Sequence, residues 1–429
     1  MSDKMEGHIL NLYEDLDMTF RELRDVSHKI LTGSISGIEE KMDGQNLTFT
    51  VKDDRLLIFG KRMDRKILAE RGTVWETIDE NYSEITREGF RSAYFIIESH
   101  IKQFSKDTID KVFKNGKIVI ESAMITPVVP VTIKYRESYI RFIRPFSPFS
   151  EDINSDEYKE AYSILTQGES FYIDNNSKTW SVGPKPILKI SSSNREIDKT
   201  CERIDKEIFL LVDKFSKNLS IGSTFEDYAT IEVSNYIEKY HQSIPKEILK
   251  RAGSRISKKQ KGHFGLREIK KEFPEKHKEI WREIKKIEKN EILVLTQSIV
   301  GLEVLIQKIS SLIFDHLEFQ LSTRHSQVKD LKREVSRIRA AHRKGKVKVL
   351  NTSTGEVDNL SEKWEMKLDV ALIRAKELQL LRKPVEGIVF TIQNESGQVR
   401  RKLTGMFTAI HRLTGLFKFP SQGEKLIIV

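Results

Sequence analysis

A period of two over residues 45–60, with strict alternation of apolar and polar residues from Asn46 to Val51, constrains the fold more than any other feature of this sequence. In "QNLTFTV" every second side chain is apolar, the polar turn "KDDR" follows, and "LLIFGKR" comes next. Successive side chains of a β-strand point to opposite faces, so this pattern predicts a β-hairpin with one buried face. The segment "EEKMDG" directly before it places Lys41 beside a tight Asp43-Gly44 turn.

Helical and extended patterns alternate along the rest of the chain. Apolar spacing predicts a helix over 13–32, which Gly33 would stop, and further helix over 84–112. The segments "GKIVIES", "VTIKY" and "YIRFIRPF" predict a second group of strands, with "PVVP" forcing a turn or an edge between the first two. From about 195 to 345 the patterns are helical and rich in Lys and Glu. A hairpin "KVKVLNTSTGEV", a helix near 361–382 and the strands of "EGIVFTIQNESGQVRRKLTG" follow.

These patterns predict an α+β chain in which a large helical insertion interrupts mainly antiparallel sheets. The predicted parts are a β-rich first part (1–195), a basic helical insertion (196–383) and C-terminal strands that complete the first part (384–429). A chain of 429 residues is long enough for two or three domains with a sizeable core.

Charge and composition favour an anionic partner such as nucleic acid. There are 73 Lys and Arg against 63 Asp and Glu, a formal net charge of +10. Cys201 is the single cysteine, which excludes an intrachain disulfide and a cysteine-rich zinc site. The first residues lack the pattern of a secretory signal, and polar side chains interrupt "ILVLTQSIVGLEVLIQKISSLIF", which favours a buried helix over a membrane span. We therefore expect a cytoplasmic protein without a membrane partner.

The residues around Lys41 resemble the first motif of the covalent nucleotidyltransferases, which comprise ATP-dependent DNA ligases, RNA ligases and mRNA capping enzymes. That motif is a Lys-x-Asp/His-Gly turn before a strand, and here it reads "EKMDGQN". The likeness is closest to phage-type and RNA-editing-type RNA ligases. In those a glutamate precedes the lysine, an asparagine follows it by five residues, and a Lys-Arg pair ends the next strand; this chain has Glu40, Asn46 and Lys61-Arg62 there.

Later segments resemble the remaining motifs, in the family's order. Matching residues are Glu121 in "KIVIES" (third motif), Phe142 or alternatively Tyr139 in the base-stacking strand "YIRFI", Glu386 in "EGIVF" (fourth motif), and Arg400 and Lys402 in "VRRKL" (fifth motif). The resemblance covers about residues 35–145 and 384–404, and implies a nucleotidyltransferase (ligase adenylation) fold. No G-x-x-x-x-G-K-[ST] loop is present, so ATP would be bound without a Walker cradle.

The resemblance implies covalent catalysis with Lys41 as the nucleophile. Its amine would attack the α-phosphate of ATP to form lysyl-AMP, which requires nearby cations and partial burial to depress the pKa of the lysine. Lys402 and Arg400 would supply that charge and stabilise the phosphate. Asp43 would belong to the same nucleotide-binding turn, in which Gly44 would let the backbone approach the nucleotide.

Carboxylates and further cations complete the implied site. Glu121 and Glu386 would bind Mg²⁺ or Mn²⁺ and the ribose hydroxyls, because hard divalent ions prefer oxygen ligands. Arg62, after Lys61, would bind a phosphate of the acceptor strand through its planar fork. Glu40 and Asn46 would orient the nucleotide.

Some features depart from the family pattern. Ile120 stands before Glu121 where glycine is usual, and the fifth motif begins with arginine instead of lysine. Residues 122–385 separate the third and fourth motifs, and too few residues follow Lys402 for the β-barrel OB module of DNA ligases and capping enzymes. We expect the basic helices of 196–383 to replace that module and hold nucleic acid by its phosphates. The alternative is a solvated helical bundle for partner binding, because "REIKKIEKNE" interleaves opposite charges.

The sequence thus predicts an ATP-dependent, RNA-ligase-like adenylyltransferase with RNA favoured over DNA as the acceptor. A phage-like protein of this kind would act in a host cytoplasm. Two alternatives stay open. One is a catalytically degenerate nucleotidyltransferase fold that binds nucleic acid or belongs to a virion, and the other is a guanylyltransferase that caps RNA.

Overall fold

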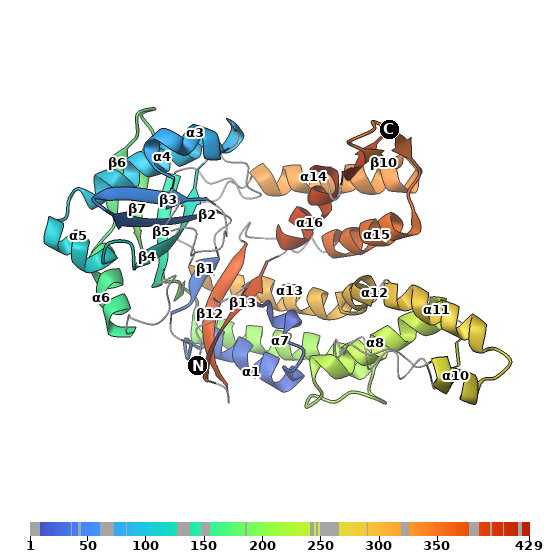
Figure 1. Cartoon of the computed structure of the whole chain (residues 1–429). Helices are drawn as coiled ribbons and strands as arrows, with labels where there is room; N and C mark the ends of the chain where they lie inside the picture. The colour runs from blue at the N-terminus through green and yellow to red at the C-terminus, as the bar shows by residue number, and fades with distance from the viewer. Residues whose placement is uncertain are drawn as a thin grey trace.

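The structure is a mixed α/β architecture with antiparallel and mixed sheets, in agreement with the predicted α+β class. This computed structural model describes residues 9–35, 37–41, 44–60, 73–82, 84–126, 138–146, 155–184, 187–240, 244–245, 248, 266–289, 291–318, 326–376, 386–394, 397–405, 407–418 and 423–429. Figure 1 shows a small central sheet with a sheet-and-helix group on one side, a group of C-terminal elements on the other, and a layer of helices below.

The largest sheet has six strands in the order β3-β2-β4-β5-β7-β6. They are β2 (Gln45–Lys52), β3 (Arg55–Phe59), β4 (Val119–Ile125), β5 (Ser138–Phe146), β6 (Ser170–Ile173) and β7 (Thr179–Pro184). Only β5 and β7 pair in parallel among these described strands. The predicted hairpin is confirmed as β2 and β3, joined by Asp53 and Asp54 at positive φ. The predicted segments "PVVP" and "VTIKY" lie outside the described residues.

Three helices cover one face of this sheet, namely α4 (Glu84–Ile101), α5 (Lys106–Phe113) and α6 (Ser155–Leu165). A short turn, η2 (Trp75–Thr77), and α3 (Ile78–Asn81) lead into α4. Leu47 and Phe49 are fully buried in the core beneath these helices and Val51 is nearly so, as the alternation predicted.

The central sheet is antiparallel and brings the two ends of the chain together. It has the order β1-β12-β13, with β1 (Glu39–Lys41), β12 (Gly387–Asn394) and β13 (Gly397–Thr404). One face carries Ile388, Phe390 and Leu403, which pack on η1 (Leu12–Glu14), α1 (Phe20–Leu31), α7 (Asn194–Lys214) and α13 (Val300–Phe314). Helix α1 ends where predicted, with Gly33 at a φ of +71°. Helices α7 and α13, which were expected in an insertion, therefore form the core of this sheet.

The predicted helical region is confirmed, and its outer part has a core of its own. Helices α8 (Phe225–Tyr240), α10 (Leu266–Glu272), α11 (His277–Lys289) and α12 (Glu291–Ser298) share a cluster of buried isoleucines and valines. The long apolar segment is buried helix as predicted, but it forms two helices, α12 and α13. Strands β8 (Lys189–Ile190) and β9 (Leu317–Glu318) pair beside it. Within the part of the chain that is described, no helix has both the length and the apolarity to span a membrane.

The C-terminal elements form a further group that the sequence-based division did not anticipate. It contains α14 (Ser326–Arg343), β10 (Val347–Asn351), β11 (Val357–Asp358), α15 (Glu362–Lys376), α16 (Phe407–Lys418) and β14 (Glu424–Ile428), with strand order β11-β10-β14. The chain leaves the central sheet after β13, so its last segment packs with elements from 326–376. The same cluster includes Ala123, Ile125 and Tyr139, so this group also packs on the second face of the six-stranded sheet.

A buried carboxylate, Glu303 on α13, connects distant parts of the chain. Its Oε2 lies 2.5 Å from Nε of Arg374 on α15, and its Oε1 accepts a 2.9 Å hydrogen bond from Nη1 of Arg412 on α16. Arg412 Nη2 donates to the hydroxyl of Tyr13 at 3.1 Å. Burial, reinforced by the charge of Glu303, raises the pKa of Tyr13, so its hydroxyl stays neutral. The network ties η1, α15 and α16 to α13.

We expect Glu303→Gln to lower the free energy of unfolding by about 3–5 kcal/mol, because it leaves two arginines without a buried counter-charge. Urea denaturation followed by circular dichroism measures this change. Asp156→Asn is the matched control, since it removes a 2.9 Å ion pair with Lys159 in which both side chains are at least 75% exposed. The control should change stability by less than about 1 kcal/mol. Equal midpoints for both variants would contradict a stabilising role of the network.

Candidate functional site

Lys41 lies where the chain crosses from the central sheet to the six-stranded sheet. It is the last residue of β1, and β2 begins four residues later at Gln45. Lys41 is in register with Gly387, and its Nζ donates to Oε1 of Glu386, the residue directly before β12. The side chains of Lys41 and Glu386 are 23% and 20% exposed. Two residues that the sequence predicted to act together are therefore an ion pair.

The predicted cations share one face of the central sheet. Lys41, Gly387 and Thr404 form one cross-strand row. The next row on that face is Glu39, Val389 and Lys402, with Val389 in the middle, and Arg400 stands in the row after that, opposite Thr391. Residues in one antiparallel row point to the same face, and every second residue along a strand does so too. The face with Lys41, Arg400 and Lys402 is thus opposite the one that packs on α1, α7 and α13.

The side chains on this face are ordered by close contacts. Lys402 is only 5% exposed. Arg400 Nη2 donates to Oε2 of Glu39 at 2.9 Å. Arg401, between these cations, points to the other face and pairs with Asp15 at 2.6 Å. The expectation that two cations two residues apart face one way agrees with this register.

Glu40 does not join this group. It is in register with Ile388 on the face covered by helices, and its side chain is 1% exposed. The nucleotide-binding role that the resemblance assigned to Glu40 does not fit this position; the side chain belongs to the interior between sheet and helices.

Tyr162 of α6 is a neighbour of this face that sequence reasoning missed. Burial, reinforced by the charge of Glu39 and opposed by that of Arg400, raises the pKa of Tyr162 to about 12. Its hydroxyl donates to the backbone carbonyl of Phe142 on β5 at 3.1 Å. A neutral phenol bonded to β5 therefore lies near the Glu39–Arg400 pair. No spacing in the sequence relates α6 to β1, so no sequence signal could have identified it.

A second polar cluster lies on the six-stranded sheet. Asn46 Nδ2 donates to Oε1 of Glu121 at 3.2 Å, and Arg144 Nε donates to Oε2 of Glu121 at 3.0 Å. Thr48 Oγ1 donates to Oδ1 of Asn46 at 3.1 Å. The predicted residues Asn46 and Glu121 are thus in contact. Arg144 was not predicted, and a register shift between Glu121 and Ser122 sets it opposite Glu121.

Phe142 lies in the core and not on the face of Glu121. It is fully buried, with its ring centroid 5.7 Å from that of Phe49 and 5.6 Å from that of His100. We therefore correct the base-stacking role given to Phe142, because its ring packs under the helices. The alternative, Tyr139, is on the same face as Glu121, where the Arg141 guanidinium lies 4.7 Å from its ring centroid.

Two glycines at the crossing are required by close packing of the backbone. A Cβ at Gly44 would lie 2.8 Å from Cγ1 of Ile125 and 2.9 Å from the carbonyl oxygen of Met124. At Gly387 a Cβ would overlap the carbonyl oxygen of Leu403, and its φ is +151°. Gly44 thus has a role in passing close to β4, in addition to the expected approach to a nucleotide.

The described residues were also tested for a divalent-ion site. Oε2 of Glu386 is buried and has no hydrogen-bond partner among them, so this oxygen fits an ion or a ribose hydroxyl. Both oxygens of Glu121 accept hydrogen bonds. No group of three or more His, Cys, Asp or Glu within the described ranges could hold a metal. An ion here would take most of its ligands from phosphate and water oxygens. Asp43, Lys61 and Arg62 lie outside the described residues.

Comparison with protein-family models gave no match, and comparison with the curated proteins gave none either. The candidate site is therefore defined by its own geometry. It consists of Lys41 and Glu386 with Lys402 and Arg400 on the central sheet, and of the Asn46–Glu121 cluster on the six-stranded sheet.

Proposed function

We propose that the chain has a nucleotidyltransferase fold and is an ATP-dependent, RNA-ligase-like adenylyltransferase. The observation that carries the proposal is the Lys41–Glu386 pair on a sheet face that also presents Lys402 and Arg400. A partly buried lysine on a sheet face that carries further cations, with a carboxylate to accept its proton, suits covalent catalysis by an amine. The acceptor we propose is RNA in preference to DNA.

In the proposed reaction Lys41 Nζ attacks the α-phosphate of ATP. A P–N bond forms, the P–O bond to pyrophosphate breaks, and pyrophosphate leaves with that electron pair while the amine loses a proton. Lys402 and Arg400 stabilise the negative charge that develops on the phosphate. The AMP group then passes to the 5′-phosphate of a nucleic acid, which activates that end for joining to a 3′-hydroxyl.

Glu386 has two roles in this scheme. Its Oε1 already accepts a hydrogen bond from Nζ, so it orients the amine and is placed to receive the proton. Its second oxygen, Oε2, is buried without a hydrogen-bond partner among the described residues and would bind a ribose hydroxyl of the nucleotide or its metal. Bound Mg²⁺ or Mn²⁺ would neutralise charge on the triphosphate.

We expect α-labelled ATP with Mg²⁺ or Mn²⁺ to leave a covalent adduct on the chain that survives a denaturing gel. Lys41→Ala should abolish the label because the attacking amine is gone. Glu386→Gln should reduce labelling by about 10²-fold or more through loss of the proton acceptor. Lys159→Ala, a change at an exposed lysine of α6, is the control and should label normally.

The result also separates the alternatives. Labelling by GTP in place of ATP would replace this proposal by a guanylyltransferase. No adduct with either nucleotide would overturn catalysis and favour a degenerate fold.

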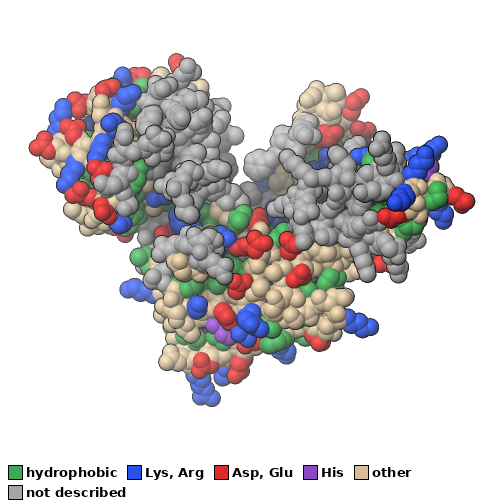
Figure 2. Space-filling view, turned by 60° about the horizontal axis from the view of Figure 1, so that its bottom comes forward, with side chains coloured by type: hydrophobic (Ala, Val, Ile, Leu, Met, Phe, Trp, Pro, Cys, Tyr) green, Lys and Arg blue, Asp and Glu red, His purple; other side chains and the backbone are tan. Residues whose placement is uncertain are grey.

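The outer helices are the proposed contact with nucleic acid. Ile280, Ile284 and Ile287 of α11 are buried against α8 and α12, so Arg282 and Lys285 point outward. Acidic side chains are interspersed, as in the 2.6 Å pair of Glu283 and Lys286. Figure 2 likewise shows basic and acidic side chains mixed over the visible described surface. Binding through α11 would therefore involve a few phosphates only.

We expect the affinity for single-stranded RNA to fall with salt, by about 0.7 log units per log unit of salt for each phosphate contacted. The double variant Arg282→Glu, Lys285→Glu should flatten that slope by about 1.4 if both residues contact phosphates. Fluorescence anisotropy across a salt series measures it, with Lys159→Glu as the control. An unchanged slope in the double variant would exclude α11 from the interface and favour partner binding by the helices.

A further inference from the structure

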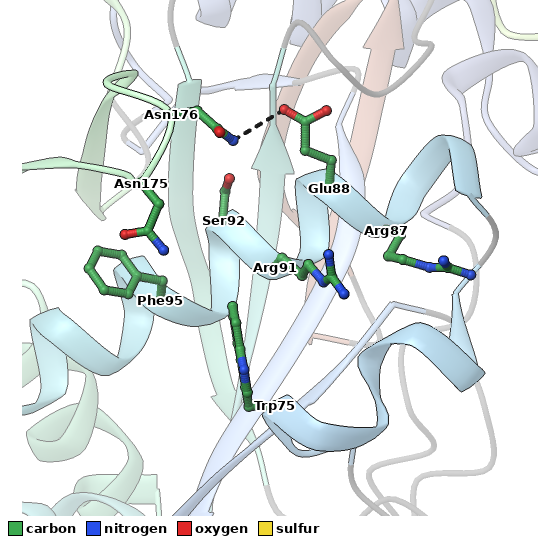
Figure 3. A pocket seen from close by; sticks show the side chains of 8 residues that line it. All are labelled: Trp75, Arg87, Glu88, Arg91, Ser92, Phe95, Asn175 and Asn176. Carbon is green, nitrogen blue, oxygen red and sulfur yellow. Dashed lines mark hydrogen bonds between the residues drawn. The ribbon is translucent and has the colours of Figure 1, made fainter.

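A pocket of about 450 Å³ lies against α4, and its lining includes none of the residues of the Lys41 site. Its wall comes from η2, α4 and the turn between β6 and β7, and includes Trp75, Arg87, Arg91, Phe95, Asn175 and Asn176 (Figure 3). Helix α4 covers the sheet face that carries Phe49, whereas Asn46 and Glu121 are on the opposite face. The six-stranded sheet therefore separates this pocket from the Asn46–Glu121 cluster.

Trp75 supplies an open aromatic surface. Its side chain is 44% exposed, although indoles are usually well buried. Tyr94 supports it from behind, with ring centroids 5.7 Å apart. In Figure 3 Trp75 lies at one end of the pocket and Asn176 at the other, with Arg91 and Arg87 along one side. A planar ligand group can stack on this indole without moving the protein.

Two arginines on the same wall are held in position by one aspartate. Arg87 Nη2 donates to the backbone carbonyl of Asp79 at 3.0 Å, and its Nε lies 3.7 Å from Oδ1 of that residue. Arg91 Nη2 donates to Oδ2 of Asp79. A guanidinium has five N–H donors, so these contacts leave donors on each arginine for a ligand. Arginines four residues apart on a helix are neighbours, and two forks side by side suit phosphate oxygens.

The acidic residue of the pocket is balanced by its own partners. Glu88 Oε1 accepts hydrogen bonds from Lys178 Nζ at 3.0 Å and from Asn176 Nδ2 at 3.3 Å, the latter drawn in Figure 3. Among the residues that line the pocket, two arginines stand against one glutamate, so the lining has a formal charge of +1. An anion is therefore favoured at the arginine wall.

We infer that this pocket binds a nucleoside-phosphate unit, with the base stacked on Trp75 and the phosphate on Arg87 and Arg91. The carboxamide of Asn175 is placed at the pocket wall beside Phe95, where a base edge would meet a donor and an acceptor. The same chemistry is present in a single strand and in a free mononucleotide. This site goes beyond the proposed ligase activity and requires no reaction.

Binding of a labelled RNA tetranucleotide, measured by anisotropy, and of AMP, measured by calorimetry, tests the inference. Trp75→Ala should weaken binding by roughly 5- to 150-fold, the range found for loss of one base–aromatic stack. Arg87→Gln with Arg91→Gln should weaken it by losing the phosphate contact. Phe171→Ala is the matched control, because this residue is an exposed aromatic on β6 that does not line the pocket.

Each outcome decides one point. Weakening confined to the tetranucleotide assigns the pocket to a strand, and weakening confined to AMP assigns it to a free nucleotide. Full-strength binding by Trp75→Ala and by the arginine variant, or no binding by the unmodified chain, overturns the inference. The pocket variants should still form the lysyl-AMP adduct, and Lys41→Ala should still bind at the pocket, so failure of either proposal is distinguishable from failure of the other.

Discussion

The buried charge of Glu303 is the constraint on which the arrangement of the central sheet depends. Its partners, Arg374 and Arg412, belong to α15, the last described helix before β12, and to α16, which follows β13. Both helices are therefore anchored on α13, the helix that also packs under the strand pair with Arg400 and Lys402. A buried ion pair contributes little net stability, because desolvation offsets its Coulomb energy, but leaving one partner out is costly. The network thus selects one arrangement of these elements against others.

The candidate site follows from that arrangement and from the crossing at Lys41. Segments more than 300 residues apart supply the lysine and its carboxylate partner, which meet because β1 adds to the edge of β12. Because Gly44 has no side chain, the chain can pass close to β4 there. Gly387 likewise lets β12 pass close to the backbone of Leu403 on β13. Tyr162, bonded to β5, lies near the Glu39–Arg400 pair of the central sheet. The chemistry proposed for Lys41 therefore depends on long-range packing, and local sequence alone would not bring these groups together.

Sequence patterns predicted the elements whose two faces differ in polarity and failed where both faces are apolar. The hairpin was predictable because Leu47 and Phe49 are on one face of β2 and Thr48 and Thr50 on the other, although all four side chains are buried. In "YIRFIRPF" apolar side chains occupy both faces, since α4 to α6 cover one side of β5 and the C-terminal group covers the other. Alternation could not then decide between Phe142 and Tyr139, and the register shift beside Glu121 hid the role of Arg144. Motif order assigned Lys41, Glu386, Asn46 and Glu121 to one predicted site, and the structure pairs Lys41 with Glu386 and Asn46 with Glu121. It did not predict the return of α16 and β14 to the C-terminal group, because that pairing has no local signal.

Packing divides the predicted helical insertion into two parts. One part packs in the core of the central sheet, and the other buries a cluster of side chains among its own helices. Without α7 and α13, Ile388, Phe390 and Leu403 would face water, at a cost of about 1.5–3 kcal/mol for each large side chain. Those two helices are therefore committed to the core of the central sheet and cannot have been added as a separate module. Helices α8, α10, α11 and α12 bury a different cluster among themselves, so their outward faces are free of that constraint. If any part of this region binds a protein partner or a nucleic acid, we expect the outer helices to do so. Helices α7 and α13 are already packed in the core of the central sheet.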